Sequence, residues 1–337
     1  MPTEKSTESL WPRNRLAVAA VIVATIALLT VAENAAVSAY LSSSGRFASD
    51  FSATALEHKL DAIAKQPPQV VFMGDSALWG YGVPADGNAV ALLAKGGCSC
   101  VNLSFKAGSP PNYYALTLLF AKFHVHPKLV VLEINQPSFS PGDQSYKTLA
   151  PALAALAGPL MTPADRSTLD VADGGEGVLA RLGAAMASAW LVYGARADLR
   201  DALSGDADAV PKERPVAEDF LGTYDLAPLD ERNVGVRYLE AVADALREQR
   251  IPAIAFLTPT NHALVHEFID VPAYARNADY LVKILESRGI RVVDLDRAFP
   301  QVDFIDNTHL TQRGQQLLAA TLANDIPALR IPSPPAR

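Results

Sequence analysis

Five short apolar segments, each nearly continuous in hydrophobicity, constrain the fold of this 337-residue chain more than any other feature. They are Val70–Met73, Val101–Leu103, Leu129–Ile134, Ala253–Leu257 and Val292–Leu295. A continuous apolar strand is typical of a parallel sheet, in which strands are buried on both faces. Helical patterns lie between or after them, at Ala89–Lys95, Pro111–Phe123, Val234–Arg250, Tyr274–Arg288 and Thr311–Leu322. This alternation predicts an α/β fold: a three-layer α/β/α sandwich with a five-stranded, mainly parallel sheet.

The N-terminal region contains one long apolar segment, from Leu16 to Ala32. Its length of about 17 residues is near the lower limit for a helix that spans the hydrocarbon core. Basic residues precede it and Glu33 follows it, so the positive-inside rule keeps the N-terminus in the cytoplasm. The small residues Val37-Ser38-Ala39 leave open a cleaved secretory signal, but the apolar run is longer than the usual signal core. We favour a single-pass anchor in the inner membrane, with the C-terminal domain in the periplasm.

The chain is expected to divide into three regions. Residues 1–38 form a cytoplasmic tail and transmembrane anchor, 39–67 a helical stalk, and 68–330 the α/β domain. Within this domain, residues 141–232 contain helical patterns but no strand, and so form an insertion far longer than an ordinary connection. The insertion either packs on the domain as an elaboration or forms a cap or a docking surface, for example for a membrane-protein partner.

Composition excludes several classes of function. The net charge of −7 and the absence of a Lys/Arg stripe argue against nucleic-acid binding. No glycine-rich phosphate loop is present, and we expect no cofactor. His124, His126 and His266 lack a carboxylate or thiolate at ligand spacing, so we expect no metal site.

Cys98 and Cys100 are the two cysteines of the chain. Outside the cytoplasm a disulfide is chemically permitted, but residues i and i+2 of a strand lie near the upper limit of its Cα separation. The pair is therefore expected to be two buried thiols or a local bridge, with a redox or metal role as the less favoured alternative.

A candidate catalytic set appears at the ends of the predicted strands. Ser76 follows the first strand in the sequence Gly74-Asp75-Ser76, and Asp306 and His309 follow the fifth. A serine hydroxyl becomes a nucleophile when an imidazole accepts its proton and an acid orients that imidazole. Because ligands bind beyond the carboxyl ends of parallel strands, we expect these three side chains to meet there.

The same edge carries candidate donors for a developing oxyanion. These are the backbone N–H groups of Ser76 and Gly108, which follow the first and second strands, and the carboxamide of Asn135, which follows the third. Each element is common on its own in turns or helix caps. Their order and their positions at strand ends favour a catalytic site.

These residues resemble the sequence blocks of the SGNH (GDSL-type) hydrolase superfamily over about residues 68–324, apart from the insertion. The blocks are Gly74-Asp75-Ser76, the segment from Asn102 to Gly108, Asn135, and Asp306-x-x-His309. The third block departs from the family pattern Gly-x-Asn-Asp, since this chain has Glu133-Ile134-Asn135-Gln136.

The layout is similar to that of membrane-anchored relatives that act in D-alanine transfer to teichoic acids or in polysaccharide O-acetylation. By that resemblance, Asn261 and His262 are candidate substrate-binding residues on the loop after the fourth strand.

The resemblance implies an extracytoplasmic serine esterase or O-acyltransferase with an acyl-Ser76 intermediate. We expect an envelope glycan or another ester as its substrate. The alternative is a non-catalytic envelope protein whose domain binds a glycan or a membrane partner, an idea that the altered third block suggests.

Overall fold

The computed structural model describes residues 11–43, 46–48, 50–143, 146–171, 186–187, 190–204, 215–220 and 222–329. Its centre is one parallel sheet of five strands in the order β2-β1-β3-β4-β5. The strands are β1 (Val70–Met73), β2 (Cys100–Asn102), β3 (Leu129–Ile134), β4 (Ala253–Leu257) and β5 (Arg291–Asp294). Every pairing is parallel, so all five carboxyl ends lie at one edge of the sheet.

Successive side chains of the central strands point to opposite faces of the sheet and enter two separate cores. Val71 and Met73 belong to the larger core, whereas Val70 and Phe72 belong to the other. Strands β1 and β3 are buried along their whole length. This double burial explains why their sequences are continuously apolar.

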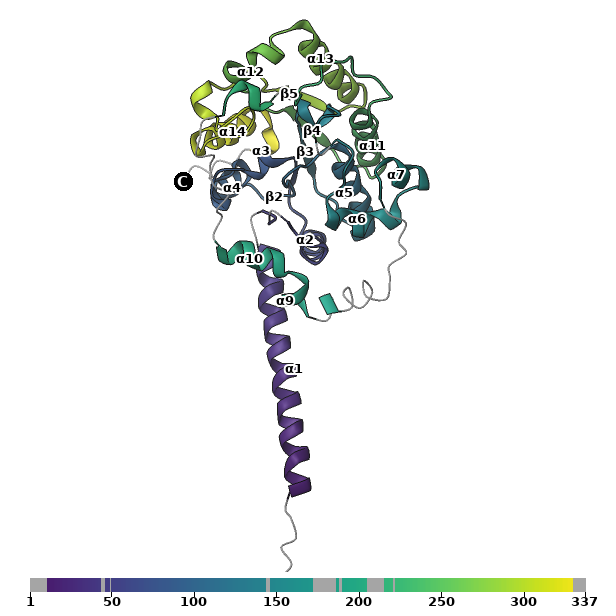
Figure 1. The fold of residues 1–337 in the computed structure, drawn as a ribbon, viewed down its shortest axis with the longest axis vertical. Helices are drawn as coiled ribbons and strands as arrows, with labels where there is room; N and C mark the ends of the chain where they lie inside the picture. Colours follow the sequence, from purple (N-terminus) through teal and green to yellow (C-terminus); the bar gives the residue numbers. More distant parts are fainter. Residues whose placement is uncertain are drawn as a thin grey trace, which may run out of the picture.

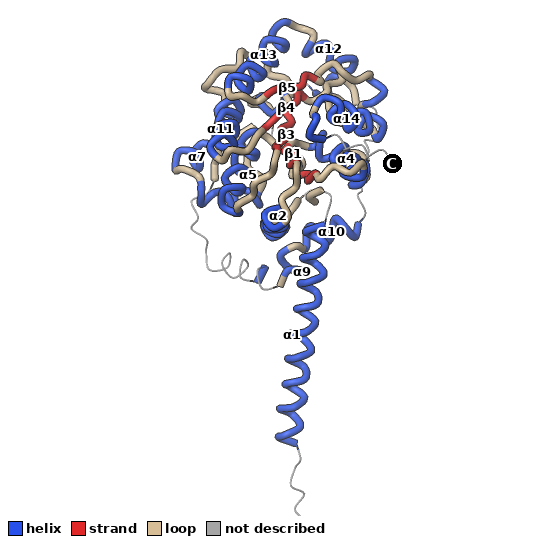
Figure 2. The backbone as a smooth tube through the Cα atoms, turned by 180° about the vertical axis from the view of Figure 1, so that it is seen from behind, coloured by secondary structure: helices blue, strands red, loops and turns tan. Residues whose placement is uncertain are grey.

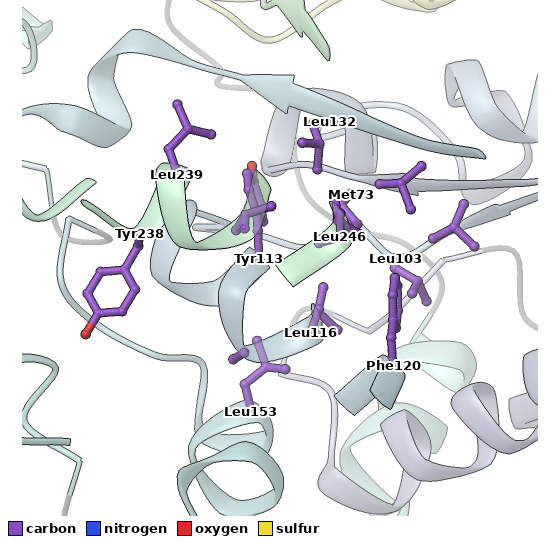
Figure 3. Close-up of a cluster of buried hydrophobic side chains, with 14 of the residues drawn as sticks. Met73, Leu103, Tyr113, Leu116, Phe120, Leu132, Leu153, Tyr238, Leu239 and Leu246 are labelled. Carbon is purple, nitrogen blue, oxygen red and sulfur yellow. The ribbon is translucent and has the colours of Figure 1, made fainter. Parts of the chain in front are cut away.

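Helices cover both faces of the sheet (Figures 1 and 2). The larger core is shared with α2 (Ala53–Lys65), α5 (Pro110–Phe123), α6 (Pro151–Ala157), α11 (Val234–Glu248) and α13 (Pro272–Ser287). Figure 3 shows how Leu116, Leu239 and Leu246 of these helices meet Met73 and Leu132 of the sheet. The opposite face is covered by α4 (Ala89–Lys95) and α14 (Gln312–Asp325).

The predicted three-layer fold is confirmed, with strand and helix limits displaced by at most three residues. Three helices of the described residues were not predicted from the sequence. They are α3 (Ser76–Trp79), which is a single turn, α7 (Pro163–Thr168), and α12 (His262–Ile269), which is kinked at Val265. None is long enough to give a clear helical repeat of apolar residues.

The N-terminal helix α1 spans Trp11–Ser43 and projects from the domain (Figure 1). Its segment Ala17–Leu41 is the one helix long and apolar enough to cross a membrane among the described residues. Its large apolar side chains are exposed from Val18 to Val31, whereas Val37 and Leu41 are buried against the domain.

The region expected to be a stalk, residues 39–67, contains α2, which is part of the domain. Ser52 caps this helix by accepting a hydrogen bond from the Ala55 N–H at 3.0 Å. Leu56, Leu60 and Ile63 then lie on its buried face, in the same core as β1 and β3. The helical spacing of these residues thus reflects packing on the sheet.

The described part of the insertion is helical, as expected. Besides α6 it contains α7 (Pro163–Thr168), α9 (Leu191–Gly194) and α10 (Arg196–Ser204). Helix α6 packs on the larger core, whereas α9 and α10 lie beside the end of α1 that joins the domain (Figures 1 and 2). The helical patterns expected in the insertion include residues 178–185 and 188–189 as well, which lie outside the described residues, as do residues 172–177 and 205–214.

Cys98 and Cys100 form a disulfide with a Cα separation of 5.3 Å, which is the local bridge among the alternatives. The bridge joins Cys98, which lies two residues before the start of β2, to Cys100, the first residue of β2. It also packs at the edge of the smaller core.

If α2 is part of the domain, Leu60→Ala should destabilise the protein by about 2–5 kcal/mol, because it opens a cavity in a filled core. Asp61→Ala, an exposed position on the same helix, is the control and should have little effect. Chemical unfolding of the full chain in detergent measures both. Equal stability of the two variants would contradict the packing of α2.

Candidate active site

Ser76 is the first residue of α3, directly after the turn that ends β1. Asp75 caps this helix, since its side chain accepts a hydrogen bond from the Ala77 N–H at 2.8 Å. Gly80 ends the helix with a φ of 94°, a conformation that favours glycine. The turn holds Ser76 at the carboxyl edge of the sheet, with its backbone N–H at the unpaired start of a helix.

Ser76, His309 and Asp306 form a continuous hydrogen-bonded chain. The Ser76 Oγ lies 2.8 Å from His309 Nε2, and His309 Nδ1 lies 2.6 Å from Asp306 Oδ2. Residues separated by 233 positions in the sequence are thereby joined at one edge of the sheet. The order hydroxyl, imidazole, carboxylate is the one that activates a serine nucleophile.

The loop between β5 and α14 fixes the orientation of Asp306. Its Oδ1 accepts the backbone N–H groups of Thr308 at 3.1 Å and His309 at 2.8 Å, so Oδ2 is directed at the imidazole. Burial by itself raises the pKa of the Asp306 carboxyl, but the hydrogen bonds and charge of His309 hold that pKa below its ordinary value. Asp306 therefore remains an anion that can orient the imidazole.

Aromatic side chains flank Ser76 and His309. The Tyr81 ring packs on the His309 ring with centroids 4.5 Å apart. Trp79 is 1% exposed and belongs to the larger core, and its indole N–H donates to the Phe47 carbonyl at 2.8 Å. Of these two aromatic residues, Tyr81 contacts His309 and so lines the site, whereas Trp79 packs in the larger core.

Asn135 lies beside the Ser76 turn. Its Nδ2 donates to Asp75 Oδ2 at 2.6 Å, and the side chain is almost completely buried. A carboxamide nitrogen carries two N–H groups, so this contact fixes the side chain while one N–H remains for a ligand.

Gly108 approaches the same turn from the loop between β2 and α5. A Cβ at this position would collide with the carbonyl oxygen of Gly74, so glycine is required for the close approach. Its N–H donates to the Phe105 carbonyl at 3.1 Å. For Gly108 to donate to an oxyanion, as predicted, its hydrogen bond to the Phe105 carbonyl must break. The close approach of Gly108 to Gly74 requires no such change.

Glu133 is the least expected residue of the site, because it is a charged residue type within an otherwise apolar strand and is fully buried. Its Oε2 accepts the Asp75 N–H at 2.8 Å and the Leu78 N–H at 3.3 Å. Its Oε1 accepts the Thr258 hydroxyl at 3.3 Å. The Glu133 carboxyl thus bonds the backbone on both sides of Ser76, and its Oε2 occupies the space in which Gly74 has no side chain.

Burial and the neighbouring Asp75 carboxyl raise the pKa of Glu133 well above its ordinary value. The backbone N–H donors of Asp75 and Leu78 oppose this shift but are weaker. A protonated Glu133 has an O–H to donate and avoids an unpaired buried charge.

Asn261 and His262 form hydrogen bonds with neighbouring loops. Asn261 Nδ2 donates to the Asp306 carbonyl at 3.0 Å, so this side chain supports the Asp306 loop. His262 Nε2 lies 2.8 Å from Asp296 Oδ2, and its Nδ1 lies 3.4 Å from Asp270 Oδ1. Asp296 also accepts the Tyr274 hydroxyl at 2.6 Å. In this conformation both ring nitrogens of His262 are occupied by carboxyl groups.

Two amide side chains bond the backbone carbonyl groups of α3, the helix that starts at Ser76. Gln315 of α14 donates to the Ala77 carbonyl at 2.9 Å, and Asn102 of β2 donates to the Leu78 carbonyl at 3.3 Å. The helix that starts at Ser76 is therefore tied to the helix that follows His309. Within the described residues, no group of three or more His, Cys, Asp or Glu side chains is arranged to hold a metal ion.

Sequence reasoning brought together Ser76, Asp306, His309 and Asn135, all of which lie at this edge. It noted the replacement at Glu133 without finding its contacts, although a lone acid within an apolar strand is a detectable signal. It missed Asp296 and Gln315, which carry no signal in the sequence that separates them from ordinary surface residues.

No curated protein sequence matches this chain. A protein-family model matches residues 231–329, which include Asp306 and His309. Similar solved structures include esterase EstA from Pseudoalteromonas sp., at 12% identity and a TM-score of 0.40, covering 77% of this chain and 97% of that chain.

Two further solved structures are similar over an equal share of the chain. One is a member of the lipolytic protein G-D-S-L family from Veillonella parvula (12% identity, TM-score 0.39, 77% and 97% covered). The other is Est24, a carbohydrate acetylesterase from Sinorhizobium meliloti (8% identity, TM-score 0.39, 77% and 99% covered). The chemistry of the site follows from this chain's own residues.

The Glu133 contacts predict different outcomes for two substitutions. Glu133→Gln keeps an acceptor for the Asp75 N–H and should fold, because it mimics the protonated acid. Glu133→Ala should lose about 1–3 kcal/mol for each backbone donor left unpaired.

Because its folded-state pKa is raised, Glu133 contributes stability at low pH that is lost as the pH rises from about 4. The advantage of the wild type over Glu133→Gln should therefore shrink between acidic and neutral pH in urea unfolding. Equal stability of the Gln and Ala variants would contradict the contact, and a pH-independent difference would contradict the raised pKa.

Proposed function

We propose that this protein is a membrane-anchored, extracytoplasmic serine esterase or O-acyltransferase of the SGNH type. The observation that carries the proposal is the 2.8 Å contact between Ser76 Oγ and His309 Nε2, together with Asp306 on the other ring nitrogen. This arrangement activates a hydroxyl for attack on an acyl carbon.

In the first half-reaction, His309 accepts the Ser76 proton while Oγ forms a bond to the acyl carbon. The tetrahedral intermediate collapses as the bond to the leaving oxygen breaks, and His309 delivers its proton to that oxygen. An acyl-Ser76 ester remains. In the second half-reaction, water or an acceptor hydroxyl attacks this ester, again with His309 as the base, and Ser76 recovers its proton.

The oxyanion of each tetrahedral intermediate needs donors that are already in position. The Ser76 N–H and the second N–H of Asn135 are suited to this role, since both belong to groups that the Asp75 turn fixes. Gly108 contributes mainly by allowing the loop after β2 to approach the turn.

The apolar segment is proposed to remain as an uncleaved anchor in the inner membrane, with the domain in the periplasm. Cleavage at Val37-Ser38-Ala39 would cut inside α1. Val37 is 7% exposed, and Ser38 Oγ lies 3.3 Å from His58 Nδ1 of α2. These contacts support retention of α1 because the residues around the cleavage position form part of the folded domain.

An anchored site at the membrane surface favours an acceptor or donor in the cell envelope, such as a glycan hydroxyl or its O-acyl ester. The alternative is a non-catalytic domain that binds a glycan or a membrane-protein partner. The altered third block suggested this alternative, but Glu133 fits the Ser76 turn and leaves the three catalytic side chains in contact.

Labelling with a fluorophosphonate tests for an activated serine. The full chain in detergent should be labelled, whereas Ser76→Ala and His309→Ala should not be, because either change breaks the hydrogen-bonded chain. Labelling is measured by in-gel fluorescence, with Tyr193→Phe as a folded control outside the site. Unlabelled wild-type protein that is folded would support the binding alternative.

The rate of labelling should fall on acidification because a protonated imidazole cannot accept the Ser76 proton. Asp306 should not contribute, since its pKa lies below the ordinary carboxyl value. The second-order rate constant is measured from pH 4 to 9. A rate constant that is unchanged down to about pH 4 would exclude His309 as the base.

A further inference from the structure

The segment of residues 190–200, which contains Trp190, α9 and the start of α10, is here named the collar. It lies against the end of α1 that joins the domain (Figures 1 and 2). The Trp190 indole N–H donates to Glu33 Oε2 at 3.2 Å, and the Leu191 N–H donates to Asn34 Oδ1 at 2.8 Å. A part of the insertion thus binds the first polar side chains that follow the apolar segment of α1.

The collar is also fixed to the domain. Ala195 is buried with Val37 and Leu41 of α1 and with Ala55 of α2. Asp198, which is 4% exposed, accepts the Ser52 hydroxyl at 2.8 Å. These contacts hold the collar at one position along the axis of α1.

That position coincides with the edge of the hydrocarbon layer. The apolar run of about 17 residues extends about 25 Å as a helix, close to the thickness of a hydrocarbon core. If Leu16–Ala32 spans this core, Glu33 lies at the headgroup level on the domain side. Trp190 must lie at the same level because it is bonded to Glu33.

The side chains of the collar are those that suit the membrane interface. Trp190 is 41% exposed, and its ring stacks near that of Tyr193 at 6.5 Å. Exposed Arg196 covers the Tyr193 ring, with Cζ 4.5 Å from the centroid. Tryptophan and tyrosine concentrate at headgroup level, where their rings have both an apolar face and a polar atom. Arginine at the same height is suited to lipid phosphate.

We infer that the collar is a second membrane contact, which inserts Trp190 into the headgroup layer of the leaflet on the domain side. This inference rests on the proposed anchoring of α1. Contact with the bilayer at α1 alone would let the domain tilt, whereas a contact beside the helix opposes tilting. The insertion would then act, in this part, as a support on the membrane and not as a cap over Ser76.

Depth-dependent quenching by brominated lipids tests the inference on the full chain in proteoliposomes. The chain has three tryptophans, and Trp79 is 1% exposed in the core. Trp11→Phe therefore leaves Trp190 as the tryptophan that lipid can reach, and the difference from Trp11→Phe/Trp190→Phe isolates its emission. Bromine close to the headgroup should remove most of this emission, and bromine at the chain terminus should remove little.

The control places an exposed tryptophan away from α1, as Val302→Trp in the variant with both Phe substitutions. Val302 is 65% exposed, and its short 3-10 helix Gln301–Asp303 contacts α12. Helix α12 lies at the end of the domain opposite α1 (Figures 1 and 2). The emission of this tryptophan should be unaffected by either lipid.

The outcomes separate the two proposals. Protein that floats with the liposomes but shows no quenching of Trp190 would overturn the collar contact and leave the anchor intact. Stronger quenching by terminal bromine would also overturn it, since Trp190 would then lie in the hydrocarbon. Protein that does not float with the liposomes would contradict both the anchor and the collar contact.

Discussion

The candidate site depends on one buried carboxyl group. Glu133 accepts the backbone N–H groups of Asp75 and Leu78, which lie before and after Ser76. Asp75 in turn fixes Asn135. A turn between a strand and a helix has few contacts of its own, so a polar side chain beneath it determines its conformation. The third sequence block, whose departure from the family pattern suggested a non-catalytic domain, thus supplies a contact that holds the Ser76 turn in position.

The fold could be predicted from the sequence because the strands are buried on both faces. Segments such as Leu129–Ile134 leave no alternation that would suggest an exposed sheet. The meeting of Ser76, Asp306 and His309 could be predicted because parallel strands place their carboxyl ends at one edge of the sheet. The contacts of Gln315, Asp296 and the collar could not be predicted from the sequence. They join residues that are distant in the sequence, through side chains of common types. Helix α2 was assigned to a stalk for the same reason: an amphipathic pattern shows that a face is buried but not which surface covers it.

The segment that leaves the membrane helix reaches the Ser76 turn directly. Arg46 is 6% exposed, and its guanidinium donates to the Gly80 carbonyl at 2.9 Å and covers the Trp79 ring at 3.9 Å. The Phe47 carbonyl accepts the Trp79 indole N–H. The end of α3 is therefore bonded to residues that follow α1 by only a few positions. Because α3 begins at Ser76, the segment after α1 and the Ser76 turn are connected through a short set of buried contacts.

This connection changes what membrane anchoring does for the proposed reaction. A flexible tether raises the local concentration of an enzyme near its substrate but leaves its orientation free. Here Val37 and Leu41 of α1 pack against α2, Arg46 bonds the end of α3, and the collar bonds Asn34 of α1. If α1 is the proposed anchor, these contacts give Ser76 one height and one direction relative to the bilayer. A substrate carried by the membrane, or by a partner within it, would meet the site in a constant geometry, which favours a fixed acyl donor over diverse soluble esters.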